Sequence, residues 1–206
     1  FDTFGSVPQI IKEFGGKPFL TDCNTLYPGS RKNALEHLEC AWENGFTALT
    51  AGCPILIGDG LKGTDDVEVP VPGGEYVDKA LIGRAIMDAD VFISLTHFKG
   101  HEMTGFGGTI KNIGMGCGSR AGKMHQHNNG QATIHEDRCR GCRICQRECA
   151  NDALVFDAAT RKMHVDLDKC VGCGRCLGSC NFDAIEFVNG NAVEILNYRM
   201  AEYAKS

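Results

Sequence analysis

Eight of the chain's twelve cysteines lie in two runs that share one spacing. In each run, two residues separate the first three cysteines from one another, and three residues precede the fourth. The first run comprises Cys139, Cys142, Cys145 and Cys149, and the second comprises Cys170, Cys173, Cys176 and Cys180. Thiolates at this spacing hold cubane iron–sulfur clusters, which carry redox chemistry. The sequence therefore predicts two [4Fe–4S] clusters as cofactors.

The spacing also predicts which cysteines hold each cluster. Three thiolates of a tight C-x-x-C-x-x-C loop can face one metal centre, whereas the fourth points away and ligates the cluster of the other run. The first predicted set is Cys139, Cys142, Cys145 and Cys180, and the second is Cys170, Cys173, Cys176 and Cys149. Structural zinc and disulfides are the alternatives. Zinc sites usually show two separated C-x-x-C pairs, and nothing in the sequence points to the oxidising compartment that disulfides need.

Residues 132–188 read as an internal duplication with a period of 31 residues, which is the separation of Cys139 and Cys170. Each half predicts a short strand, a cysteine loop, one helical turn and a return strand. Over residues 131–190 this pattern resembles the bacterial two-cluster ferredoxin, which implies a small α+β domain. That family usually has proline after the fourth cysteine, whereas here Ala150 and Asn181 follow. Since proline stiffens the turn and supplies no ligand, we expect altered rigidity and retained clusters.

The composition allows one ordinary domain and a small one. The chain has 206 residues, 43% of them hydrophobic, and its net charge of −5 argues against general nucleic-acid binding. No apolar run reaches the roughly 18 residues of a membrane span, and no signal peptide is visible. Residue 1 is Phe, which indicates that the start is trimmed or lies upstream. Cubane clusters and many reduced thiols predict a cytoplasmic protein, in an organism that tolerates little oxygen.

Residues 1–130 alternate predicted helices and strands, which is typical of an α/β domain. We predict helices over residues 8–15, 31–44 and 76–87, with Ser30 as the cap of the second. Leu35, Leu38 and Trp42 share one face of that second helix, which we assign to the core. Strands are predicted over residues 17–22, 54–59, 66–71 and 90–96, the last of them apolar and central. The predicted fold is thus a mostly parallel sheet with flanking helices, joined to the small cysteine-rich domain.

The segment from residue 97 to residue 127 concentrates glycines, histidines and cations after the predicted central strand. It holds eight glycines, four of the seven histidines, and a single acid, Glu102. Ligands of α/β sheets bind beyond the carboxyl ends of strands, and glycines let backbone N–H groups approach an anion. We therefore predict a site for a phosphate, a carboxylate or an anionic cofactor. Its predicted binding residues are His97, Lys99, His101, Lys111, Arg120, Lys123, His125 and His127.

The alternative for this segment is a glycine-rich surface loop with solvated lysines, since it matches neither a P-loop nor a G-x-G-x-x-G fingerprint. His97 and His101 could chelate a metal from a helix, but Gly100 favours a loop in which they form hydrogen bonds. Cys117 could be a reactive thiol or an extra ligand, yet the sequence fixes no base beside it, which favours a buried or inert thiol. The other cysteines outside the two runs are predicted to be small core residues: Cys23, Cys40 and Cys53.

Three stretches of this region resemble a known family: residues 20–31, 96–101 and 105–116. They resemble the iron–sulfur-associated proteins called domain of unknown function 362, over nearly all of residues 1–130 and including the fused two-cluster module. The resemblance implies no established activity. Members of that family extend beyond both ends of this sequence, which implies that the chain is an internal fragment. A helix is predicted within residues 191–206, and it would then continue into a missing segment. We expect one face of this helix to dock on the body of the protein through Val193, Leu196, Met200 and Tyr203.

Three classes of function fit these observations. The first is an electron-transfer protein or oxidoreductase component, whose two clusters exchange electrons with a partner or with an anionic ligand near residues 97–127. The second is an electron carrier whose α/β part only docks a partner enzyme. The third is a non-redox ligand-binding or sensory domain with structural clusters. No flavin or nicotinamide fingerprint is present, so we expect the immediate redox partner to be another protein. The sequence leaves open whether the chain is itself an enzyme and which substrate it serves.

Overall fold

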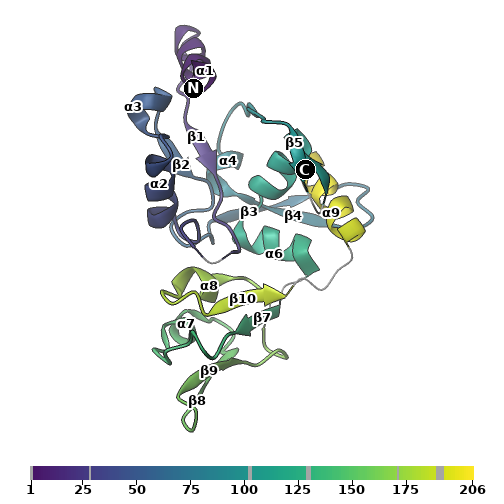
Figure 1. Ribbon diagram of the computed structural model, residues 1–206. Helices are drawn as coiled ribbons and strands as arrows, with labels where there is room; N and C mark the ends of the chain where they lie inside the picture. Colours follow the sequence, from purple (N-terminus) through teal and green to yellow (C-terminus); the bar gives the residue numbers. More distant parts are fainter. Residues whose placement is uncertain (1, 28, 102–103, 129–130, 171, 189–192) are drawn as a thin grey trace.

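The computed structural model describes residues 2–27, 29–101, 104–128, 131–170, 172–188 and 193–206. Figure 1 shows two lobes, one above the other. The upper one, here called the α/β lobe, contains the described residues up to 128 together with the last helix, residues 193–205. The lower one, here called the cysteine lobe, contains the described residues from 131 to 188. None of the described helices is long and apolar enough to cross a lipid bilayer.

The α/β lobe is a mixture of short helices and small sheets. Its first half contains α1 (Asp2–Glu13), β1 (Leu20–Asp22), α2 (Ala34–Glu43), α3 (Ala48–Ala51), β2 (Ile55–Ile57), β3 (Asp66–Pro70), β4 (Lys79–Gly83) and α4 (Arg84–Met87). Its second half contains β5 (Lys99–His101), β6 (Gly105–Gly107), α5 (Thr109–Lys111), the π-helical turn η1 (Asn112–Gly116), α6 (Arg120–Asn128) and α9 (Val193–Lys205).

Strand pairing in this lobe differs from the predicted parallel sheet. β1 and β2 are parallel, with Leu20 opposite Ile55, whereas β3–β4 and β5–β6 are antiparallel hairpins. The described residues contain only two-stranded sheets. Residues 90–96, predicted as the central strand, form no strand, and Val91 is 75% exposed. An apolar run has a high propensity to form a strand, but a strand also needs a neighbour that accepts and donates its backbone hydrogen bonds. No described strand pairs with residues 90–96.

Two helix predictions are also wrong in part. Residues 76–87 form β4 and the short α4 instead of one helix, because β3 offers a complete antiparallel partner from Asp66 to Pro70. The α2 helix begins at Ala34, and its cap is Asn33 rather than Ser30. The Asn33 side chain accepts a hydrogen bond of 3.1 Å from the backbone N–H of Glu36.

The face of α2 that was predicted to be core is exposed. Leu35 and Trp42 are 70% and 68% exposed, and Leu38 is 36% exposed. The face turned inward carries His37 instead, which is 5% exposed. Helical periodicity locates an apolar stripe, but it does not say which side of the helix the rest of the chain covers.

The core of the α/β lobe lies between β4, α4 and α9. Its buried residues are Cys23, Val71, Val77, Ala80, Ile82, Ile86, Cys117 and Tyr203. The predicted docking of the last helix is confirmed, since Leu196, Met200 and Tyr203 are all buried and α9 packs on η1, α5 and α6. The side chain of Val193 lies outside the described ones. Cys23, Cys53 and Cys117 are buried as predicted, and Cys40 is half-buried.

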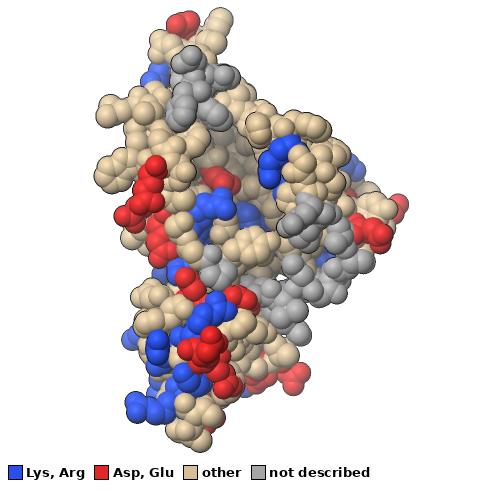
Figure 2. Space-filling view, viewed as in Figure 1, with Lys and Arg blue, Asp and Glu red and all other residues tan. Residues whose placement is uncertain are grey.

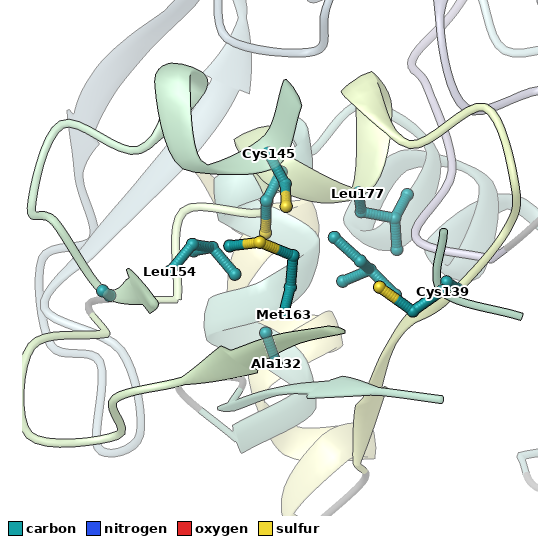
Figure 3. Close-up of a cluster of buried hydrophobic side chains, with 10 residues drawn as sticks. Ala132, Cys139, Cys145, Leu154, Met163 and Leu177 are labelled. Atoms are coloured by element: carbon teal, nitrogen blue, oxygen red, sulfur yellow. The ribbon is translucent and has the colours of Figure 1, made fainter. Parts of the chain in front are cut away.

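The cysteine lobe repeats one arrangement twice. Its elements are β7 (Gln131–Ile134), α7 (Ile144–Glu148), β8 (Leu154–Asp157), β9 (Lys162–Val165), α8 (Arg175–Ser179) and β10 (Ile185–Val188). β7 pairs with β10 and β8 with β9, both antiparallel, while α7 packs on α8. In Figure 3, Cys145, Leu154, Met163 and Leu177 converge between these two helices and the strands. The predicted order of strand, cysteine loop, helical turn and return strand is therefore present in both halves.

Candidate functional site

The two cysteine runs have matching backbone conformations. The residues that cap α7 and α8, Arg143 and Gly174, are both left-handed, with φ of 63° and 68°. The fourth cysteines, Cys149 and Cys180, end these helices with the same ψ of 108°. The conformation of the two loops therefore repeats, and in both runs the fourth cysteine follows the end of the short helix.

One pocket of this lobe brings together cysteines of both runs. It is lined by three cysteines of the first run and the last of the second: Cys139, Cys142, Cys145 and Cys180. Ile134, Met163 and Ile185 are among the apolar residues that complete its wall. Burial raises the pKa of the Cys145 thiol to about 11, and nearby Cys180, Cys142 and Cys139 add to this rise. These are the four cysteines that the spacing assigns to one cluster.

The other three cysteines of the second predicted set lie near Cys176, which is 8% exposed. Burial raises the pKa of the Cys176 thiol to about 12, and four other cysteines raise it further: Cys173, Cys145, Cys170 and Cys149. Three of these four belong to the second predicted set, and the remaining one, Cys145, belongs to the first. Among the described residues, no three His, Cys, Asp or Glu side chains lie close enough to hold a single metal ion.

Three cations of the α/β lobe contact the cysteine lobe beside its cysteines. Lys32, which is 5% exposed, donates hydrogen bonds to the Cys180 carbonyl oxygen at 2.8 Å and to Asp183 Oδ1 at 2.6 Å. Lys62 pairs with Glu148 at 2.7 Å, one residue before Cys149. Arg120 is 0% exposed and lies against α8. Lys32 and Lys62 were not predicted from the sequence, because no local pattern marks a lysine that contacts a distant segment.

The eight residues of the predicted anion site are not brought together. Arg120 lies at the contact between the lobes, and Lys123 is buried with its amine donating to the carbonyl oxygen of Gly118 at 2.6 Å. His125 Nδ1 lies 3.0 Å from the Tyr203 hydroxyl, and burial lowers the pKa of this histidine. His127 is half-buried on α6, whereas His97 is exposed. These side chains lie in different surroundings, so the structure does not bring all eight together in a single site.

Three of the eight residues do form a group at the β5–β6 hairpin. The Lys111 amine contacts His101 Nε2. A Cβ atom on Gly107 would lie 3.8 Å from Lys99 Cγ and 3.9 Å from Lys111 Cδ, so the two lysines flank the same glycine. Burial lowers the pKa of Lys111, and the charge of Lys99 lowers it further. Glu102, the one acid of this segment, lies outside the described residues.

The ends of the two parallel strands carry a second polar group that sequence analysis missed. Asp59 follows β2 and is 0% exposed, and its Oδ1 accepts hydrogen bonds of 2.9 Å from the Asn24 backbone and side chain. Its Oδ2 accepts a hydrogen bond of 3.1 Å from the backbone N–H of Arg120. Burial raises the pKa of Asp59. Figure 2 shows a hollow on the viewed face of the α/β lobe, with acidic and basic side chains at its floor.

Cys117 lies near this region. Burial raises the pKa of its thiol to about 11, so it remains a neutral thiol near pH 7. This agrees with the prediction of an inert cysteine.

Residues 2–205 match the family described as Domain of unknown function (DUF362). No curated protein and no solved structure matches the chain. The matched range spans both lobes, including all eight cysteines of the two runs.

Proposed function

The chain belongs to the DUF362 family, and we propose that it is an iron–sulfur electron-transfer protein whose cysteine lobe is ferredoxin-like. The observation that supports this most is the pocket lined by Cys139, Cys142, Cys145 and Cys180. Three of these residues are neighbours in the chain, whereas the fourth comes from the far end of the repeat. A disulfide framework or a zinc site built from one run would not require this crossing.

The donor set and its surroundings fit a pair of cubane clusters. Cys139, Cys142, Cys145 and Cys180 would hold one, and Cys149, Cys170, Cys173 and Cys176 would hold the other. When bound, such clusters supply one-electron redox chemistry. The chain's own contribution is burial: Leu154, Met163 and Leu177 are at most 2% exposed and belong to the same core cluster as Cys139, Cys145 and Cys176. Exclusion of water and hydrogen bonding to sulfur are the means by which a protein sets the reduction potential.

The α/β lobe would bind the partner or ligand that exchanges electrons with the clusters. Lys99 and Lys111 place two positive charges beside one glycine, an arrangement whose repulsion a bound anion would relieve. We therefore propose that Lys99, His101 and Lys111 bind an anionic group, either on a small molecule or on a redox partner protein. This is narrower than the site expected from the sequence, which included eight residues.

Anaerobic purification followed by iron and sulfide analysis tests the proposal. We expect about eight iron atoms per chain, since each of two cubanes contains four. Dye-mediated titration should then reduce both clusters reversibly, each by one electron. A protein that contains zinc instead would overturn the assignment. Clusters that remain intact but cannot be reduced reversibly would favour the alternative of a non-redox sensory domain.

A further inference from the structure

Arg120 is the largest fully buried side chain in the described structure, and it lies between the two lobes. Its backbone N–H donates to Asp59, and its Nη1 donates to the carbonyl oxygen of Lys62 at 2.5 Å. Its Nη2 donates to the carbonyl oxygen of Lys32. The Nε atom is buried and has no hydrogen-bonding partner among the described residues. A buried guanidinium N–H without an acceptor lowers the stability of the folded protein, so we expect this donor to have a partner.

The Arg120 side chain runs along α8, between two glycines. A Cβ atom on Gly174 would lie 2.6 Å from Arg120 Cδ, and one on Gly178 would lie 2.0 Å from Nη1. Because Nε is bonded between Cδ and the guanidinium carbon, it lies beside the same helix. That helix carries Cys176. Burial lowers the pKa of Arg120, while the charges of Asp59, Cys176 and Cys173 act in the opposite direction.

The first half of the repeat is different at the matched positions. One period of 31 residues before Gly174 and Gly178 stand Arg143, which caps α7, and Arg147, which lies within it, and both are exposed. Arg143 Nε already donates to Gln146 at 2.9 Å. Lys32 also approaches the first set, at the Cys180 carbonyl, but its charge is paired with Asp183. Exposed or paired charges are screened, whereas a buried cation acts through a less polar medium.

We propose that Arg120 positions and tunes the second cluster, by donating its Nε–H to a sulfur of the group held by Cys149, Cys170, Cys173 and Cys176. This inference rests on the proposed function. A hydrogen bond to sulfur and a nearby positive charge both favour the reduced form, which carries one more negative charge. Arg120 therefore sets the potential of the second cluster above that of the first. It also links that cluster to Asp59, at the ends of β1 and β2.

The test is a redox titration of holoprotein variants, followed by electron paramagnetic resonance. Arg120→Met should make the one-electron reduction of one cluster at least tenfold less favourable. This corresponds to a decrease of about 59 mV or more in its reduction potential. Arg120→Lys should give a smaller decrease, because it keeps the charge and loses the Nε donor. Asp59→Asn removes a negative charge from beside Arg120 and should shift the same potential upward. Arg147→Met, on the exposed matched position, should shift neither potential.

Two further variants identify the affected cluster and guard against misfolding. In a Cys142→Ala background, which disrupts the first set, the Arg120→Met shift should persist. If Arg120→Met fails to fold, Gly178→Ala replaces it, since the new Cβ displaces the guanidinium and should lower the same potential. Full iron content with unchanged potentials in the Arg120, Asp59 and Gly178 variants overturns this inference and leaves the proposed function standing. Wild-type protein without iron–sulfur clusters overturns both.

Discussion

The contact between the lobes depends on Lys32, and Lys32→Met should weaken it measurably. The amine is buried and donates to the Cys180 carbonyl oxygen at 2.8 Å and to Asp183 at 2.6 Å. A hydrogen bond from a charged donor contributes about 1.5–3 kcal/mol. The Asp183 side chain is 40% exposed, so its ion pair is screened and adds no more than about 1 kcal/mol. We therefore expect a loss of about 1.5–4 kcal/mol, because methionine fills the space but leaves the carbonyl without its donor.

Hydrogen–deuterium exchange of the anaerobic holoprotein measures this loss at the contact itself, without unfolding the chain. A change of 2 kcal/mol corresponds to roughly thirtyfold faster exchange, since each 1.4 kcal/mol is tenfold. The acceleration should appear in the peptides around residues 32 and 183. It should be absent from β3 and β4.

Lys79→Met is the matched control. Its ion pair with Glu68 has the same length, 2.6 Å, but the two side chains are 54% and 57% exposed. Exposed pairs contribute about 0–1 kcal/mol. Equal effects of Lys32→Met and Lys79→Met would refute the reasoning, because burial would then make no difference to the contact.

Three further predictions concern the lobes separately. A chelator with oxygen should unfold residues 132–188 and leave the α/β lobe protected from hydrogen exchange, since the small lobe packs around its cysteines. Burial, followed by Arg199 and Lys79, lowers the pKa of His125 from 6.5, so folding stability should fall as the pH drops from 6.5 through that lowered value. The thermal midpoint of His125→Gln should vary less over this interval. Lys111→Ala should weaken phosphate or carboxylate binding by about 1–3 kcal/mol in calorimetry and leave the iron content unchanged. The control variant Lys169→Ala should leave anion binding unchanged.

The cysteine lobe was the part most predictable from sequence, because its information is local. The spacing of Cys139 to Cys149, repeated from Cys170, fixes two similar loops, and the structure gives them the same capping conformations. The order of strands and short helices follows from the same repeat. The last strand of the second half, β10, pairs with the first strand of the first half, β7.

The α/β lobe was less predictable, because its determinants are distant in the chain. Leu35 and Trp42 form a regular apolar stripe, yet the chain packs on the side of His37. The run at residues 90–96 has high strand propensity but no described strand beside it. Arg120 resembled an anion ligand because its neighbours in sequence are glycines and cations. Its environment is set instead by Asp59 and by α8, which no local pattern connects to it.

The most direct test of the central claim compares iron contents of double cysteine variants. Each of Cys142→Ala, Cys149→Ala and Cys180→Ala should reduce iron from about eight atoms per chain to about four. Crossed ligation places Cys142 and Cys180 on one cluster, so that pair of substitutions together should still leave about four. Cys142 and Cys149 belong to different clusters, so their joint substitution should leave almost none. The reverse result, with iron retained in the Cys142/Cys149 double variant and lost in the Cys142/Cys180 one, would show that each run holds its own cluster and would contradict the account.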